Sequence, residues 1–355
     1  MIYLIIINSE TIQHKAYINR CLELARLGNG LVSPNPMVGS VLVCNDIIIG
    51  EGYHQKFGEP HAEVNAINSV KDKSLLSSAT IYVSLEPCSH FGKTPPCADL
   101  IIRNNIPRVV IATLDSNQVV CGNGVQKLKN AGIEVVIGVL ENEAIYLNKA
   151  FNTLQSTKKP FVTLKWAETS NGFIDQHRDN KNEKALQISN SSSSIWVHKL
   201  RSESDAILVG RNTVIKDNPA LNTRKWFGHH PLRVIIDTHL STIESKYKVY
   251  DQSIPTLVFN TKKSLKNGVI EYYKITDPDN LIGEILQQLG DRQIQRLLVE
   301  GGAFTHQKFI DSQQFDECFI LKSTRNIATG VLSPKIKNAN YAIFNLDTDK
   351  IIRHE

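Results

Sequence analysis

The sequence predicts an α/β protein of two domains, and three observations support this prediction. The chain has 355 residues, more than a single hydrophobic core usually accommodates. Segments with strand character alternate with segments of helical periodicity, a pattern typical of a largely parallel sheet covered by helices. Residues 151–160 (FNTLQSTKKP) interrupt this alternation with polar residues and a proline. We therefore expect a first domain in residues 1–150, a linker in 151–160 and a second domain in 161–355.

In the first domain, hydrophobic periodicity defines each element in turn. Residues 17–30 carry apolar residues at helical spacing and end on glycines, which predicts an amphipathic helix. Residues 37–54 predict a hairpin around an Asn-Asp turn. The remaining elements alternate, with strands expected at 79–88, 108–114 and 133–139 and helices at 60–70, 97–106 and 124–132. The apolar start MIYLIII is too short to span a membrane and lacks a basic n-region, so we expect a strand or an extended segment there.

The second domain restarts the same alternation. Residues 161–175 predict a strand followed by an Asn-Gly turn. The serine-rich end of residues 176–194 is expected to cap a helix at 194–204. Further strands are expected at 206–215, 232–238, 256–260 and 296–302, and a further helix at 302–310.

Composition narrows the class of protein. A hydrophobic fraction of 41% and a charged fraction of 21% are ordinary for a globular protein. The net charge of +5 is mild and the Lys and Arg residues are dispersed, so charge alone identifies no partner. With no secretion signal we expect a cytoplasmic protein, in which the reducing environment favours metal or catalytic use of cysteine over disulfides. Four cysteines are expected to pack singly in the core: Cys21, Cys44, Cys121 and Cys318.

The chemistry is concentrated around two Pro-Cys pairs in the stretch PCSHFGKTPPC, which holds Cys88 and Cys97. The upstream tripeptide HAE supplies His61 and Glu63. One imidazole and two thiolates would leave zinc with an open position, the catalytic arrangement. Such a zinc makes hydroxide available at neutral pH, and an unbound carboxylate two residues from the histidine can move the proton. Because His61 and Cys97 each open an expected helix, positive helix ends would favour thiolate and hydroxide. The pattern predicts a zinc-dependent deaminase with Glu63 as proton shuttle.

Three alternatives stand beside this hypothesis. A disulfide between Cys88 and Cys97 is disfavoured by the reducing compartment. A structural zinc site would recruit His90 as a fourth ligand and make Glu63 dispensable. A nucleic-acid deaminase would require a basic groove with aromatic residues and only two residues between its cysteines, whereas eight separate them in this sequence.

The enlarged cysteine loop also indicates a family. Together with SPNPMVGSVLV, GEGYHQKFGEPHAEV, RVVIATLDSN and GNGVQKLKNAGIEV, it resembles the bifunctional deaminase/reductase of riboflavin biosynthesis. The resemblance implies a cytidine-deaminase-like three-layer α/β/α first domain with one Zn²⁺ per chain. In that family the residues matching His61, Cys88 and Cys97 are the zinc ligands, and the residue matching Glu63 is the proton shuttle.

The same resemblance implies the substrate of the first domain. Asn35, His54 and Lys93 match family positions that contact it. The implied reaction is hydrolytic removal of ammonia from 2,5-diamino-6-(5-phosphoribosylamino)pyrimidin-4(3H)-one.

In the second domain the stretch LLVEGGAFTHQKFI joins a strand, a glycine pair and a helix, whose N-terminus offers free N–H groups to a phosphate. This stretch and DAILVGRNTVIKDNPALNTR resemble the reductase half of the same family, which has a dihydrofolate-reductase-like α/β fold and uses NADPH. The implied reaction reduces the ribosyl chain of 5-amino-6-(5-phosphoribosylamino)uracil to the ribityl form. The resemblance assigns to the cofactor Ala167, Thr213, Asp217, Thr238, Gly302, Ala303, Phe304, Thr305, His306, Gln307 and Lys308. It assigns to the reductase substrate Lys165, Arg201, Leu221, Arg224 and Glu300.

One segment departs from the family pattern. Members usually carry Ser-Gly-Glu/Asp-Ser-x-Trp-Ile-Thr after the first reductase strand, whereas NEKALQISN puts Ala185 at the usual serine and Gln187 at the tryptophan. Ser189 keeps the hydroxyl position. The alternative for the second domain is therefore a weakened or altered reductase, although Arg201 and Arg224 remain and favour an active domain.

The family also implies the partners of the chain. They are a small phosphorylated pyrimidine and a second copy of the chain, in a homo-oligomer formed through the reductase domain. Neither nucleic acid nor a membrane is expected. Arg211 and Arg224, near the expected cofactor loop, favour a phosphate-bearing ligand such as NADPH over NADH.

Overall fold

The structure is a computed structural model of the chain, and it describes residues 9–90, 95–116, 121–178, 183–242, 247–336 and 341–354. Internal contacts divide the chain into two units, Met1–Thr157 and Lys158–Glu355. The division falls inside the expected linker 151–160. Most of that segment is helical, however, because residues 149–157 form α6 (Lys149–Thr157), with Phe151 and Leu154 buried. The expected strand or extended segment at MIYLIII lies outside the described residues.

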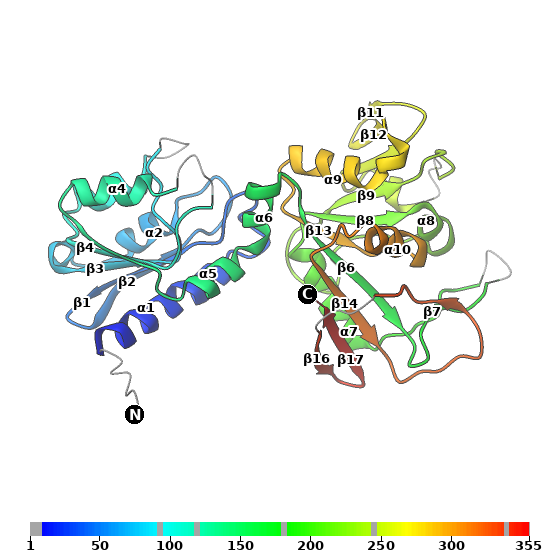
Figure 1. The fold of residues 1–355 in the computed structure, drawn as a ribbon, viewed down its shortest axis with the longest axis horizontal. Helices are drawn as coiled ribbons and strands as arrows, with labels where there is room; N and C mark the ends of the chain where they lie inside the picture. Colours follow the sequence, from blue (N-terminus) through cyan, green and yellow to red (C-terminus); the bar gives the residue numbers. More distant parts are fainter. Residues whose placement is uncertain are drawn as a thin grey trace, which may run out of the picture. The chain divides into compact units, whose positions relative to one another are not determined.

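The first unit contains one sheet with strand order β2-β1-β3-β4-β5 (Figure 1). Its strands are β1 (Gly39–Cys44), β2 (Ile47–Tyr53), β3 (Thr80–Val83), β4 (Arg108–Ile111) and β5 (Glu134–Ile137). Its helices are α1 (Ser9–Arg26), α2 (Ala62–Ser69), η1 (Lys73–Ser78), α3 (Cys97–Arg103), α4 (Asn123–Asn130) and α5 (Glu141–Leu147), followed by α6. β3, β4 and β5 are parallel, while β1 is antiparallel to both of its neighbours. The sheet is therefore mixed, because the expected hairpin supplies two of its strands.

Helices cover both faces of this sheet, which makes the three layers expected of a cytidine-deaminase-like fold. Side chains alternate along a strand, so neighbouring residues enter different cores. Leu42 and Ile81 pack in the core that contains residues of α2, α3 and α4. Val41 and Tyr82 pack in the core that contains residues of α1 and α5. Cys21 and Cys44 are buried as expected, but the core position expected for Cys121 is wrong, because that residue is exposed in the turn before α4. The hairpin turn takes positive φ at Asn45 and Asp46, as a two-residue type I′ turn requires.

The second unit contains a longer sheet with strand order β11-β12-β10-β9-β8-β13-β6-β14-β17-β16. Its strands include β6 (Phe161–Glu168), β8 (Ala206–Gly210), β9 (Leu232–Ile236), β10 (Thr256–Asn260), β11 (Leu265–Asn267), β12 (Ile270–Lys274), β13 (Arg296–Val299), β14 (Glu317–Lys322), β16 (Tyr341–Leu346) and β17 (Asp349–His354). A separate small sheet pairs β7 (Phe173–Asp175) with β15 (Val331–Leu332). The strands from β12 to β14 are parallel, and antiparallel strands stand at the two ends of the sheet.

Helices also cover both faces of the second sheet. They are α7 (Ser191–Ser202), α8 (Arg211–Asp217), α9 (Leu281–Asp291) and α10 (Ala303–Asp311), with short turns η2 (Lys248–Tyr250) and η3 (Pro278–Asn280). Apolar residues of α9 and α10 share a core with Leu208 and Val234. Val214 of α8 shares the opposite core with Ile207 and Ile235. The α/β class expected for this domain is confirmed.

Two expectations for the second unit need correction. The expected strand 206–215 ends at Gly210, and residues 211–217 form α8, so the valine and isoleucine of RNTVIKD belong to a helix. The cap of α7 is Asn190, whose side chain accepts the N–H of Ser193, and not a residue of the serine run.

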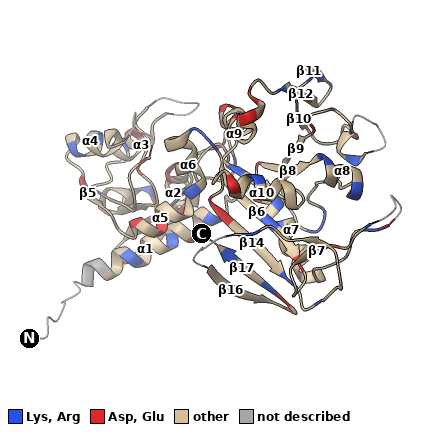
Figure 2. Cartoon of the chain, turned by 45° about the vertical axis from the view of Figure 1, so that its right-hand side comes forward, with Lys and Arg blue, Asp and Glu red and all other residues tan. Residues whose placement is uncertain are grey.

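Charged residues of both signs are dispersed in the structure, as the sequence indicates. Lys and Arg (blue) and Asp and Glu (red) are scattered over the elements of both units (Figure 2). Across the described ranges, no helix has both the length and the apolar character needed to cross a membrane.

Candidate active sites

The sequence-predicted metal ligands meet where three elements begin or end in the first unit. His61 is the N-cap of α2, and Cys97 is the first residue of α3. Cys88 follows β3 in a loop, and its carbonyl oxygen accepts the N–H of Ala98. The segments of chain that hold these three side chains are thus fixed by two helix starts and one strand end.

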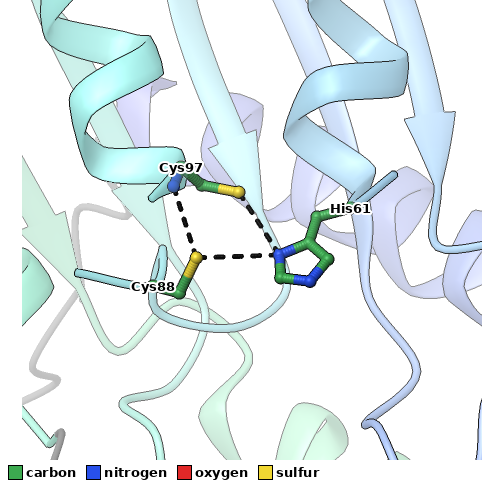
Figure 3. A group of neighbouring side chains, drawn as sticks. All are labelled: His61, Cys88 and Cys97. Carbon is green, nitrogen blue, oxygen red and sulfur yellow. Dashed lines mark hydrogen bonds between the residues drawn. The ribbon is translucent and has the colours of Figure 1, made fainter. Parts of the chain in front are cut away.

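The three candidate ligand atoms lie within 4.8 Å of one another (Figure 3). His61 Nδ1 lies 3.6 Å from Cys88 Sγ and 3.4 Å from Cys97 Sγ. Zinc bonds of about 2.3 Å to sulfur and about 2.05 Å to nitrogen at a tetrahedral angle put those atoms about 3.6 Å apart. The residues present therefore fit zinc without rearrangement, with two soft thiolates and one imidazole as donors. The backbone N–H of Cys97 also donates to Cys88 Sγ at 3.3 Å, which supports a thiolate there.

The electrostatics of the cluster favour ionised sulfur. The pKa of Cys88 is lowered to about 4, first because the Cys97 side chain hydrogen-bonds to it and further because His61 does. The pKa of His61 is raised, chiefly by its hydrogen bond to Cys88. Cys97 is the donor of the sulfur pair, and its pKa is raised for that reason. A divalent cation would convert both thiols to thiolates.

Glu63 lies in the first turn of α2 and is 3% exposed. Burial raises its pKa to about 7, and the nearby charge of Cys88 adds to the shift. A carboxyl group with this pKa can both take up and give back a proton at neutral pH.

Two of the residues predicted to bind the substrate lie beside the ligands. The ring of His54 meets the ring of His61 edge to face, with 5.4 Å between centroids. His54 Nδ1 faces the carbonyl oxygen of Pro60 at 3.1 Å, so Nδ1 carries the proton, and Nε2 accepts the Asn35 Nδ2–H at 3.0 Å. Burial lowers the pKa of His54, which keeps this arrangement neutral. Lys93, the third predicted residue, lies outside the described residues.

The alternatives with a structural metal or a disulfide find less support in this geometry. His90 is exposed and, within the described residues, does not belong to the group whose ligand atoms gather. Cys88 and Cys97 are both free thiols. In the part of the chain that the structure describes, the donor set therefore has three members and not four.

Glu86 is a buried residue that sequence reasoning missed. Its two carboxylate oxygens accept four backbone N–H groups, from Asp115, Gly122, Gly124 and Val125, at 2.9 to 3.2 Å. These bonds attach the segment at the start of α4 to the chain just before Pro87-Cys88. No sequence pattern reveals a carboxylate whose partners are backbone groups about 30 residues away.

The second unit contains a cavity of about 850 Å³ beside the ends of β6, β8 and β13. Many of the residues predicted by resemblance to bind cofactor or substrate line it: Lys165, Ala167, Thr213, Asp217, Thr238, Glu300, Gly302, Ala303, Phe304, Thr305 and Lys308. Five predicted residues do not line it: Arg201, Leu221, Arg224, His306 and Gln307. His306 is buried, with its ring nitrogens facing the carbonyls of Gly302, Lys165 and Val299.

A buried charge cluster of Lys165, Arg201 and Glu300 lies beside this cavity, and two of its members, Lys165 and Glu300, line it. Glu300 bonds Arg201 through both oxygens at 2.8 Å, and Lys165 Nζ lies 3.4 Å from Glu300 Oε2. Burial alone would raise the pKa of Glu300, but the charges of Arg201 and Lys165 lower it far below its usual value. Burial lowers the pKa of Lys165. The cluster carries a net positive charge, which suits an anionic ligand.

The segment that departs from the family pattern also lines the cavity, through Ala185 to Ser189. Beside it, Arg178 joins the wall by bonds to Asp175 at 2.8 Å, to Asp217 at 2.5 Å and to the carbonyl oxygen of Lys216 at 3.0 Å. Asp217 is predicted from the sequence and Arg178 is not. An arginine within a polar stretch gives no signal until its partners are known.

Comparisons with known proteins cover both units. A family model of the cytidine and deoxycytidylate deaminase zinc-binding region matches residues 11–113, and a model of the RibD C-terminal domain matches residues 160–323. The riboflavin biosynthesis protein RibD of Aquifex aeolicus is 40% identical over 322 residues, which cover 89% of this chain and 88% of that protein. The protein of the same name from Bacillus amyloliquefaciens is 40% identical over 310 residues, which cover 85% and 82%.

Solved structures give the same result. A crystal structure from Thermotoga maritima, described as a diaminohydroxyphosphoribosylaminopyrimidine deaminase/5-amino-6-(5-phosphoribosylamino)uracil reductase, is 37% identical with a TM-score of 0.87. The similarity covers 97% of this chain and 99% of that one. Acinetobacter baumannii RibD is 31% identical with a TM-score of 0.86, over 98% of this chain and 99% of that one.

Proposed function

Because the chain belongs to the RibD family of riboflavin biosynthesis proteins, we propose that the cluster His61, Cys88 and Cys97 and the cavity of the second unit are its two active sites. The chain is an enzyme with a zinc-dependent deaminase domain and a reductase domain. Like the Thermotoga relative, it would deaminate the diaminopyrimidinone and then reduce 5-amino-6-(5-phosphoribosylamino)uracil. The observation that carries the proposal is the three-donor set with buried Glu63 beside it.

In deamination, the chain holds one zinc and moves one proton. His61, Cys88 and Cys97 would bind the metal. Zinc, when bound there, supplies a hydroxide nucleophile at neutral pH. Glu63 takes a proton from the attacking water and returns it to the departing amine, which its pKa of about 7 allows. His54 Nε2 orients the Asn35 amide, and this pair is proposed to contact the polar edge of the pyrimidine. Lys93 is proposed to meet the same substrate.

In reduction, the chain mainly binds and orients the cofactor and the substrate. NADPH, when bound, supplies the hydride. Thr213, whose hydroxyl accepts the Gly302 N–H at 3.0 Å, holds the glycine turn that would receive the cofactor. Lys165 and Glu300 stand at the cavity wall, where they can bond the ribose hydroxyls.

The family relationship gives no preference to the alternative of a weakened reductase. The similarity to RibD of Aquifex aeolicus covers 89% of this chain and so extends through both domains, and the altered segment still lines the cavity. We further propose a homo-oligomer formed through the reductase domain and a substrate range limited to small phosphorylated pyrimidines. Sedimentation of the full chain would test the homo-oligomer. An assay of ammonia release from single-stranded DNA would test the substrate range.

One experiment tests both sites. The chain is incubated with the diaminopyrimidinone phosphate, with and without NADPH, and ammonia and nicotinamide absorbance are read separately. Ammonia should appear in both incubations, and NADPH should be consumed only after ammonia release. The variant Glu63→Gln should keep its zinc and lose ammonia release by at least about a hundredfold. Equal loss of zinc and activity would favour a structural metal.

A further inference from the structure

Three side chains hold the backbone of three consecutive residues in the loop after α8. Arg201 Nη1–H donates to the carbonyl oxygen of Asn222 at 3.1 Å. The Thr223 N–H donates to His230 Nδ1 at 3.2 Å, and the Arg224 N–H donates to His198 Nδ1 at 3.2 Å. Backbone groups of a loop are more often bonded to water or to other backbone. Side-chain bonds at each of residues 222, 223 and 224 therefore fix this loop closely.

His198 is the most buried of these three anchors, at 2% exposed, in the middle of α7. Its Nδ1 can accept the Arg224 N–H only when that nitrogen carries no proton. Burial lowers the pKa of His198 to about 4, and the nearby charges of Arg201 and Arg224 contribute to that shift. The imidazole is therefore neutral at physiological pH and able to accept.

The loop is also linked to the cavity of the second unit. Arg201, one turn after His198 on α7, bonds both oxygens of Glu300, which lines the cavity. The same guanidinium reaches Asn222. The position of residues 222–224 relative to Glu300 is thus set by one helix.

The side chain of Arg224 itself remains available. It is exposed, and within the described residues its bond to another side chain goes from Nη1 to Asn222 Oδ1 at 3.0 Å. A guanidinium with free N–H donors on a fixed backbone is suited to bind a phosphate through two bonds.

We propose that His198 is a positioning residue, which holds Arg224 where it binds the phosphate of the reductase substrate. This inference rests on the proposed function of Arg224. His198 touches neither substrate nor cofactor and acts through the Arg224 backbone. Its loss therefore weakens substrate binding and leaves hydride transfer in the bound complex largely unchanged.

The inference also predicts a pH dependence. The charged groups facing His198 are Arg201 on its own helix, Arg224 and Lys225 on the loop, and Glu300 after β13. When acid protonates His198, Nδ1 becomes a donor that opposes the Arg224 N–H, and the loop is released. Substrate affinity should fall as pH drops below about 5, in addition to any effect of the phosphate's own titration.

The experiment compares four variants of the full chain: His198→Leu, His198→Asn, Arg224→Gln and Lys199→Gln. Steady-state NADPH oxidation is measured with 5-amino-6-(5-phosphoribosylamino)uracil between about pH 3.5 and 8, a range that includes the His198 pKa of about 4. Asn Oδ1 stands where Nδ1 stands and accepts the same N–H without titrating. Lys199 is the exposed neighbour of His198 on α7 and serves as the matched control.

For His198→Leu and for Arg224→Gln we expect the KM for this substrate to rise about tenfold, with kcat and the KM for NADPH within about twofold of the parent. His198→Asn should have the same KM as the parent at neutral pH, and its KM should not show the rise in acid that is expected of the parent. Lys199→Gln should match the parent throughout.

If Arg224→Gln raises KM and His198→Leu does not, the role of His198 is refuted while the proposed function stands. An unchanged KM in Arg224→Gln refutes the phosphate assignment and the inference with it. Should His198→Leu fail to fold, the pH profile of His198→Asn decides: a profile identical to that of the parent overturns the inference.

Discussion

Replacing Glu86 with glutamine tests how the metal-binding loop of the first unit is anchored. The carboxylate accepts two N–H groups on each oxygen, from Gly124 and Val125 on Oε1 and from Asp115 and Gly122 on Oε2. Glutamine keeps one acceptor oxygen and turns an amide NH₂ towards the other two donors. Two charge-assisted bonds are lost, each worth about 1.5–3 kcal/mol, so we expect the first unit to lose at least about 3 kcal/mol of stability.

The most direct assay is hydrogen exchange of the four amides. A loss of about 3 kcal/mol corresponds to an increase in exchange rate of roughly a hundredfold. The exposed residue Glu23, also changed to glutamine, is the matched control and should leave exchange unchanged. Cys88 lies two residues after Glu86, so a less firmly held segment should also place this ligand less well. The zinc affinity of Glu86→Gln should therefore fall.

Tryptophan fluorescence provides an internal control, because it reports unfolding of the second unit. All three tryptophans, Trp166, Trp196 and Trp226, belong to the second unit, so tryptophan fluorescence during urea unfolding reports that unit alone. Glu86→Gln should leave this transition in place. Exchange that rises less than about fivefold at the four amides, equivalent to about 1 kcal/mol, would refute the anchoring role.

The remaining predictions concern the ligands and the buried charges. Cys88→Ser should lose zinc and ammonia release yet keep NADPH oxidation with the already deaminated substrate; loss of both activities in a folded variant would contradict two independent sites. Glu300→Gln leaves the buried Lys165 and Arg201 uncompensated and should destabilise the second unit by about 3 kcal/mol in urea, whereas a shift below about 1 kcal/mol would count against the cluster. His306 has a folded pKa of about 4 against an ordinary 6.5, so the stability it gives is complete above pH 6.5 and declines as pH falls towards 4. That decline should reach about 2.5 kcal/mol near pH 4.5 and be absent in His306→Gln, as urea midpoints at neutral pH and near pH 4.5 would reveal.

Much of the fold is predictable because the hydrophobic pattern is local. The hairpin 37–54 and the segments 79–88 and 108–114 contain short apolar runs, and strands form within each of them, although β3 (Thr80–Val83) and β4 (Arg108–Ile111) are shorter than expected. The short helix α8 resembles a strand in sequence because seven residues hold too few turns to reveal a helical period. The strands after residue 311 carry no turn signal strong enough to separate them, so the sequence does not predict them.

The two sites differ in how far sequence can define them. Zinc chemistry needs particular residue types at close spacing, so His61, Cys88 and Cys97 can be predicted as candidate ligands from the sequence, and the structure brings these three side chains together. Glu86, Arg178 and His198 act through backbone atoms or through carboxylates distant in sequence. Such partners meet only after folding, and no local pattern records them.

The place of α6 matters to anyone who wishes to make the two halves as separate proteins. A chain cut after residue 150 would discard a helix that belongs to the first unit and would leave the buried side chains of Phe151 and Leu154 on the wrong fragment. Division between Thr157 and Lys158 keeps that helix intact. The resulting deaminase half retains Phe151 and Leu154, which the shorter one would lose.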